Sequence, residues 1–406
     1  MLSGLISAIV PTFNRADFLV EAVDALIAQT RSLHQIVIWD DGSTDHTRSV
    51  MSKYKSFGDT EILCMSAENA GKSKALNQAI AHTTGDYIWI CDDDDIAFPD
   101  AAAELGHVLD NSLAGVVAAR HERFQIDPIS KRKDKFDSGY WPDLTHGSIF
   151  RHLLEDIFFF QPATLVRRTA YDKVGPFRED LSRSIDYEMF VRLAARFPVE
   201  LIDRVVFAQR KHDGARGPVK DRHQASQSEA VWKANDQEIF SHFRSTLPLS
   251  LYEALFDGTD PRLVRRAALL QRGCVYARRS DWVSAIGDFT TAIDSYPDAP
   301  LSETEHAIAV RALAGKHGSS AAFHAPILQK LLALRLNNAA GHSLCRALAR
   351  GAVWRARQAL TSGQISEFAK VAAFISKAGF PTNAPRDPEV PRLWERTVLP
   401  PEAYAW

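Results

Sequence analysis

The sequence has few cysteines and no marked excess of charge of either sign. Its 406 residues include four cysteines, which lie far apart without a C-x-x-C pair, and this argues against a disulfide scaffold and a zinc finger. Forty-eight basic residues stand against 50 acidic residues, giving a net charge of −2. We therefore expect a globular protein of a reducing compartment that does not bind nucleic acid.

Long apolar runs and glycine-rich phosphate motifs are also missing. The longest apolar stretches, such as Ile157 to Phe160, are far shorter than the ~20 residues of a membrane-spanning helix. No basic leader precedes the apolar stretch that starts at Ile6, so we expect no secretory signal and a cytoplasmic location. Neither G-x-G-x-x-G nor G-x-x-x-x-G-K-[ST] occurs, which argues against a dinucleotide-binding Rossmann site and a P-loop.

The first half of the chain alternates short apolar runs with helix-like segments, the pattern of an α/β fold with a mostly parallel sheet flanked by helices. Strands are predicted over Ile6–Val10, Gln35–Trp39, Ile62–Cys64 and Tyr87–Cys91. Pro11 cannot donate to a ladder and is expected to close the first strand. A polar cluster follows several of these runs, so the clusters should meet at the carboxyl edge of the sheet, where ligands bind.

Further along, the charged segment Lys131–Lys135 has no apolar period and is predicted to be a loop. Met189–Phe197 is predicted to be helical and Val199–Phe207 extended. The stretch Lys211–Gln227 is rich in glycine, proline and charge, which indicates a loop or a domain boundary.

The strongest chemical signal is the run of four aspartates, Asp92 to Asp95. Four adjacent carboxylates repel one another, and a hard divalent cation such as Mg²⁺ or Mn²⁺ would offset that repulsion while sharing phosphate oxygens. On an extended segment Asp92 and Asp94 would point to one side. The alternative is that the run caps a following helix, although caps use one or two acids.

Two further clusters lie at the same predicted edge. In Asp40–Asp45, a carboxylate could accept the imino N–H of a uracil-like base while Gly42 lets the backbone turn; alone, this is equally a turn with a helix cap. Asn69–Lys72 precedes a helix-like segment, which places Lys72 to meet a phosphate near a helix N-terminus.

Taken together, these motifs resemble those of the family 2 glycosyltransferases of GT-A fold. The resemblance rests on their order and spacing over about residues 5–217. It includes Pro11-Thr12-Phe13-Asn14, Asp40-Asp41-Gly42-Ser43-Thr44-Asp45, Asn69-Ala70-Gly71-Lys72, Gly85-Asp86-Tyr87 with Asp92–Asp95, Val174-Gly175-Pro176-Phe177, Ser184-Ile185-Asp186-Tyr187-Glu188 and Arg210-Lys211-His212-Asp213-Gly214.

The resemblance implies a role for each matching residue. The implied nucleotide-sugar contacts are Thr12, Arg15, Asp41, Lys72, Asp92 and Asp93, with Asp41 reading the base, Lys72 near the diphosphate and Asp92 near the ribose. Asp94 is the implied ligand of Mn²⁺ or Mg²⁺, which His212 approaches from the far side. Asp186 is the implied catalytic base.

One position departs from the family pattern, and two assignments have alternatives. Ile185 stands where the family has glutamate; if the segment is extended, Ile185 points away from Asp186. Asp186 could instead cap the helix that follows it, and His212 could be an ordinary loop histidine.

The implied reaction is an inverting, metal-dependent transfer of sugar from a nucleoside diphosphate, UDP by preference, to a hydroxyl acceptor. The acceptor could be a cell-surface glycan, a lipid-linked glycan or a protein, and Phe136–Gln161, with Trp141 and His146, could line its entrance; a core role for Trp141 is equally open. Two other hypotheses are a sugar-phosphate nucleotidyltransferase and a non-catalytic nucleotide-sugar-binding scaffold.

The last third of the chain is predicted to be all-α. Gly273, Tyr276, Ala285, Phe289 and Pro297 match the core of a tetratricopeptide unit, and a generic helical hairpin is the alternative. We expect domains at 1–225 and 261–406, joined by a helical linker at 226–260. Between His306 and Ser366 there are eight basic residues and no acidic one, which suits an anionic surface, either lipid head groups, as at the inner face of the plasma membrane, or an acidic polymer; a solvated basic face is the alternative. Self-association through the helical region is a separate possibility.

Overall fold

The computed structural model describes residues 3–127, 129–130, 132–211, 228–315, 319–379 and 392–406, which form two compact units. The N-terminal unit consists of Met1–Pro142 and Ile157–Ser228, and the helical unit consists of Asp143–Asp156 and Glu229–Trp406. The short segment Asp143–Asp156 thus belongs to the helical unit, although the residues on both sides of it in the sequence belong to the N-terminal unit. In the described part of the chain, no helix has the length and apolarity needed to cross a membrane.

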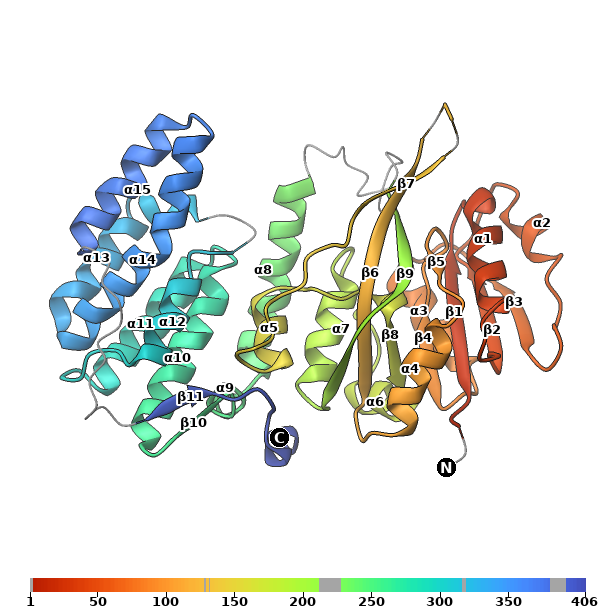
Figure 1. The fold of residues 1–406 in the computed structure, drawn as a ribbon, viewed down its shortest axis with the longest axis horizontal. Coiled ribbons are helices and arrows are strands. Elements are labelled where there is room, and N and C mark those ends of the chain that lie inside the picture. The colour runs from red at the N-terminus through yellow and green to blue at the C-terminus, as the bar shows by residue number, and fades with distance from the viewer. Residues whose placement is uncertain (1–2, 128, 131, 212–227, 316–318, 380–391) are drawn as a thin grey trace. The chain divides into compact units, whose positions relative to one another are not determined.

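The N-terminal unit is built on a nine-stranded sheet in the order β3-β2-β1-β4-β8-β6-β9-β5, with β7 paired to β6 (Figure 1). The strands are β1 (Ile6–Thr12), β2 (Gln35–Asp40), β3 (Glu61–Ser66), β4 (Tyr87–Ile90), β5 (Ile96–Ala97), β6 (Val116–Ile126), β7 (Lys133–Asp137), β8 (Thr164–Arg167) and β9 (Val199–Lys211). The β3-β2-β1-β4 half is parallel, and β8 then runs antiparallel to β4 and β6. The predicted mostly parallel α/β sheet is confirmed.

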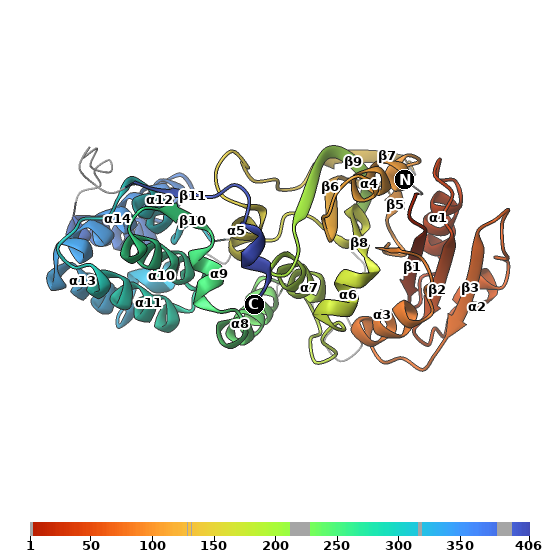
Figure 2. The same ribbon diagram turned by 90° about the horizontal axis from the view of Figure 1, so that it is seen from below.

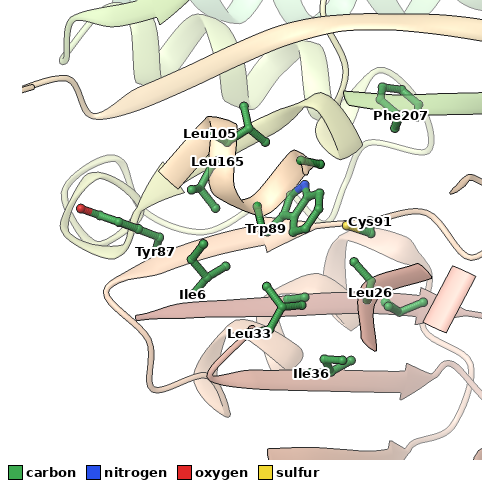
Figure 3. Packing of buried hydrophobic residues seen from close by; sticks show 14 of the residues in the cluster. Ile6, Leu26, Leu33, Ile36, Tyr87, Trp89, Cys91, Leu105, Leu165 and Phe207 are labelled. Carbon is green, nitrogen blue, oxygen red and sulfur yellow. The ribbon is translucent and has the colours of Figure 1, made fainter. Parts of the chain in front are cut away.

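Helices cover both faces of this sheet. They are α1 (Ala16–Ile27), α2 (Thr47–Met51), α3 (Lys72–Ala81), α4 (Ala101–Asp110), α6 (Arg168–Val174) and α7 (Ile185–Ala194). Figure 2 shows α1 and α4 on one face, with α3, α6 and α7 on the other. The main apolar cluster packs Leu26 of α1 and Leu105 of α4 against the strand residues Ile36, Trp89 and Leu165 (Figure 3). Removing this apolar surface from water is the main force that holds the helices on the sheet.

The prediction that Pro11 closes the first strand is wrong, because β1 continues through Thr12. The pairing of β1 with β4 stops at Ile9, whereas its pairing with β2 continues to Thr12. Pro11 therefore has a strand partner on one side only, where a missing N–H can be tolerated.

The prediction of a loop over Lys131–Lys135 is wrong from Lys133 onward, because β7 forms an antiparallel ladder with β6; Lys131 lies outside the described residues. Charge pairs across the ladder take the place of apolar alternation: Lys135 pairs with Glu122 at 2.6 Å, and Arg123 with Asp137 at 3.3 Å. Cross-strand pairs of opposite charge stabilise such a ladder.

The predicted helical character of the last third is confirmed, with small shifts in the helix boundaries, although one pair of short strands interrupts it. The helices of the helical unit are α5 (Ile149–Glu155), α8 (Ser228–Thr246), α9 (Leu249–Glu253), α10 (Pro261–Ala277), α11 (Trp282–Ser295), α12 (Glu303–Arg311), α13 (Ile327–Asn337), α14 (Ala339–Thr361) and α15 (Ile365–Ala378). Two short strands, β10 (Phe256–Gly258) and β11 (Leu393–Glu395), pair antiparallel.

The residues that match a tetratricopeptide unit lie at the contact between α10 and α11. A Cβ atom at Gly273 would stand 2.6 Å from the ring of Phe289, so only glycine fits there. Ala285 and Phe289 are buried, and the Tyr276 hydroxyl donates to the carbonyl of Phe240. The motif thus sets the close packing of one helix pair, which both the tetratricopeptide and the hairpin alternatives allow.

Candidate functional site

The loops that follow β1 and β2 are joined by one asparagine. Asn14 has a left-handed backbone (φ 54°), and its side-chain oxygen accepts from the amides of Thr44 and Asp45. Its own amide donates to the Ser43 hydroxyl at 2.8 Å. The polar clusters predicted after these two strands therefore form one connected surface at the carboxyl edge of the sheet.

The paired aspartates after β2 have different surroundings. Asp40 is fully buried and accepts from the Ser43 amide and from Arg48, as a carboxylate that fixes the turn. Asp41 accepts from the amides of Ala70 and Gly71, both at 2.9 Å, and burial raises its pKa. Because a carboxylate has about four acceptor positions, Asp41 keeps capacity for a ligand while it holds the loop before α3.

The four acids after β4 lie in a tight turn and not on the extended segment that their spacing suggested. Each one is directed to a different element. Asp92 pairs with Lys72 of α3 at 2.5 Å, and Asp94 lies 3.8 Å from Arg15 before α1. Asp95 accepts from an amide of β9, and Asp93 lies near the Thr12 hydroxyl of β1. None of the four caps α4, because its N-cap is Asp100.

Negative charge is in excess at this turn, which we call the acid turn (Asp92–Asp95). Burial and the charge of Asp94 raise the pKa of Asp93 to about 7, and burial with the charges of Asp92 and Asp94 raises that of Asp95. Burial would lower the pKa of Lys72, but the charges of Asp92, Asp186 and Asp94 raise it. The turn therefore favours the arrival of further positive charge.

The end of β9 holds the acid turn in place. The backbone amide of Arg210 donates to the Asp95 carboxylate at 2.9 Å, and its guanidinium donates to the carbonyl of Asp94. The guanidinium also pairs with Glu21 and lies over the rings of Phe18 and Phe124. His212, the predicted second metal contact, lies outside the described residues.

Asp186 lies in the first turn of α7, near the acid turn. The residue at the N-cap is Ser184, in a left-handed conformation (φ 53°), and its side chain makes no capping hydrogen bond. Asp186 accepts from the Tyr187 amide at 2.9 Å; burial raises its pKa, and the charge of Lys72 lowers it. The expected extended backbone at Ile185 and Asp186 is wrong, because both are helical, and Ile185 is buried in the core.

Two residues that the sequence gave no separate role position the loop before Asp186. Asn77 of α3 donates to the carbonyl of Phe177 and accepts from its amide. Arg192 of α7 forms a two-point pair with Glu188 and donates to the carbonyls of Val174 and Pro176. The partner of Asn77 is 100 positions away in the sequence, so no local signal reveals the contact.

A divalent cation fits the acid turn only together with a ligand. Among the described residues there is no group of three histidine, cysteine, aspartate or glutamate side chains that could hold a metal by itself. Mg²⁺ commonly binds one or two carboxylates and completes its shell with substrate phosphates and water. Burial and the charges of Asp94 and Asp92 raise the pKa of Asp93, and a nearby cation would stabilise its ionised form. The donor set thus fits a cation shared with a diphosphate.

The residues predicted to line the acceptor entrance, Trp141 and His146, belong to different units. Trp141 is half-buried, packs edge-on against Phe158 at 5.3 Å and has Arg120 at 4.9 Å. His146 belongs to the helical unit and is exposed. The contacts of Trp141 fit both roles considered for it, and its function in acceptor binding stays a prediction.

Three comparisons with known proteins extend this picture. Residues 7–175 match the family model described as Glycosyl transferase family 2. An uncharacterized glycosyltransferase of Rickettsia typhi is 28% identical over 241 residues, which cover 57% of this chain and 71% of that protein.

Two solved structures give further similarities. S. aureus TarS 1-349 in complex with UDP-GlcNAc is 14% identical, covers 97% of this chain and 99% of its own, and gives a TM-score of 0.48. The mannosyltransferase PcManGT of Pyrobaculum calidifontis, in complex with GDP-Man and Mn²⁺, is 17% identical, covers 93% and 86%, and gives 0.46. Residues 7–175, less than half of the chain, are thus similar to the family 2 glycosyltransferases, and this part includes the acid turn.

Proposed function

We propose that the chain is an inverting glycosyltransferase in which Asp186 takes the proton from a hydroxyl acceptor. One arrangement carries the proposal: a half-buried carboxylate with a raised pKa interacts electrostatically with the same lysine that pairs with the acid turn. The base and the predicted donor site thereby share one electrostatic environment.

The chemistry requires such a base because an alcohol is a poor nucleophile at neutral pH. A carboxylate within hydrogen-bond reach removes the proton as the new bond forms. A pKa raised by burial makes Asp186 a stronger proton acceptor than a solvated aspartate. With one base on one side of the sugar, a single displacement inverts the anomeric carbon.

The donor's nucleotide would lie along the edge formed by Thr12, Arg15 and Asp41, with Lys72 facing the diphosphate. Asp94 with Asp92, and His212, would hold Mn²⁺ or Mg²⁺. Such a cation, when bound, stabilises the charge on the leaving diphosphate. Lys72 adds a fixed positive charge, and Arg210 keeps the acid turn in position. UDP is the proposed donor nucleotide because Asp41 can accept the imino N–H of uracil.

The test is Asp186→Asn, assayed with a panel of nucleotide sugars and Mn²⁺. We expect loss of turnover by about a hundredfold or more, with donor binding retained by calorimetry. Asp172→Asn is the matched control, because Asp172 is an exposed acid of α6. Normal turnover in Asp186→Asn would remove Asp186 from the role of base.

The products of the wild-type reaction distinguish the remaining hypotheses. Release of a nucleoside diphosphate and an inverted anomeric centre, read by NMR of the product, supports the proposal. Release of pyrophosphate would indicate a nucleotidyltransferase. Tight donor binding without turnover on glycan, lipid-linked or protein acceptors would favour the scaffold hypothesis.

A further inference from the structure

The tip of the α14–α15 hairpin, residues 353–366, exposes large apolar side chains. Val353 is 39% exposed, Trp354 55%, Leu360 52% and Ile365 62%. Away from this face, α14 is buried through small residues, including Ala352 and Ala359. α14 and α15 run side by side (Figure 1), so their shared core is already formed without these four exposed residues.

Arginines lie on the same exposed side of α14. Arg350, Trp354 and Arg357 follow each other at spacings of four and three residues, which places them on one helix face. Arg350 and Arg357 are both exposed. Acidic residues are absent from the sequence between His306 and Ser366, and the nearby Glu367 of α15 lies 3.8 Å from Lys370.

The α14–α15 helix pair has a strongly positive net charge. Residues 339–379 contain Arg346, Arg350, Arg355, Arg357, Lys370 and Lys377 against Glu367 alone, so the net charge is +6 − 1 = +5. An unpartnered apolar tip would favour a second copy of the chain, but two copies would bring these positive charges together, and like charges repel.

We propose that the α14–α15 tip docks on the surface of an anionic lipid bilayer. Tryptophan and arginine suit the interface of a membrane, where an indole lies at headgroup level and a guanidinium meets lipid phosphate. Valine, leucine and isoleucine can enter the acyl boundary beside them, as in helices that lie in the interface plane. The docking does not depend on the proposed reaction.

The experiment uses the full chain and large vesicles of phosphatidylcholine with or without phosphatidylglycerol. We expect cosedimentation with the phosphatidylglycerol vesicles only, weakened by added salt. The double variant Arg350→Gln/Arg357→Gln should weaken binding about tenfold or more, and Trp354→Ala should also weaken it. The matched control, Arg204→Gln/Leu113→Ala, changes an exposed arginine and an exposed leucine of the N-terminal unit and should bind as the wild type does.

Several results would overturn the proposal. One is the absence of vesicle binding, and another is equal binding to vesicles without phosphatidylglycerol. A stable dimer that Trp354→Ala dissociates, measured by analytical ultracentrifugation, would assign the tip to a second copy. Binding of an anionic polysaccharide in place of vesicles would assign it to a polymer. Circular dichroism of each variant confirms that the fold is kept.

Discussion

Two regions of this molecule concentrate charged groups away from water, and the pKa values of their carboxyl groups shift in opposite directions. In the acid turn of the N-terminal unit, burial and mutual repulsion raise the pKa of Asp93 and Asp95. In the helical unit, burial would raise the pKa of Glu155, but Arg311, Arg151 and Arg278 lower it instead. The first region has surplus negative charge, and the second is balanced by its own arginines.

The balanced region is satisfied by contacts within the helical unit. Glu155 accepts from Arg311 and Gln271, both at 2.9 Å, and Glu395 accepts from Arg311 at 2.6 Å. We call this the arginine–glutamate network. A cluster in which every charge has an opposite partner is structural, whereas a cluster of carboxylates that lacks positive charge is suited to bind a ligand. The direction of the pKa shift therefore separates the two kinds of cluster.

The largest expected effect follows from changing the acid turn. Asp94→Asn should reduce turnover about a hundredfold or more because it removes a proposed metal ligand. It should not lower the unfolding temperature, since it also relieves repulsion with Asp93. Parallel kinetics and thermal denaturation measure both effects. A large loss of stability together with activity would show that the acid turn is structural.

The converse change is Glu155→Gln in the arginine–glutamate network. Leaving buried arginines without their carboxylate should cost about 3–5 kcal/mol of unfolding free energy, measured with urea. Glu253→Gln is the control, because Glu253 forms a partly exposed pair with Arg265 at 3.4 Å and should cost less than about 1 kcal/mol. Equal effects in both variants would contradict the contrast between buried and exposed pairs.

The smallest effect is the pH dependence, which should have opposite signs in the two regions. The pKa of Asp93 rises from 3.8 to about 7 on folding, so its contribution to stability falls as the pH rises through this range. The gain in stability from Asp93→Asn should therefore grow over the same range. Unfolding is measured with a chelator present, so that no bound metal contributes.

For Glu155, the pKa in the folded chain lies below the ordinary value of 4.5. Its stabilising contribution is present above that pH and is lost as the pH falls below it. The stability difference between wild type and Glu155→Gln should thus shrink in acid. A difference that is constant with pH would show that the arginines do not lower the pKa of this carboxyl.

Local patterns predicted the strands β1, β2 and β4 and the polar residues that follow them, because burial on both faces leaves continuous apolar runs. The edge strand β3 was predicted from its short apolar run Ile62–Cys64. The same reasoning did not predict β7, whose ladder depends on charge pairs with β6. It also missed the turn at Asp92–Asp95, because the partners that set its shape lie in three distant parts of the chain: α3, the residue before α1, and β9.

The arginine–glutamate network left no signal in the sequence. Its members, such as Glu155, Gln271 and Arg311, lie more than 30 positions apart and belong to no shared motif. For Asp186, the sequence predicted the motif but not the backbone conformation. The helical backbone at Ile185 depends on the packing of Ile185 and Tyr187 into the core. Long-range contacts of this kind cannot be read from spacing.

The excursion of Asp143–Asp156 into the helical unit limits how the chain can be divided experimentally. A fragment that stops after Ser228 would still carry α5, but without Gln271, Arg278 and Arg311, its hydrogen-bonding partners. Glu155 and Arg151 would then face water on an unsupported helix of seven residues. A stable N-terminal fragment therefore needs a short linker in place of residues 143–156, as well as a stop near Ser228.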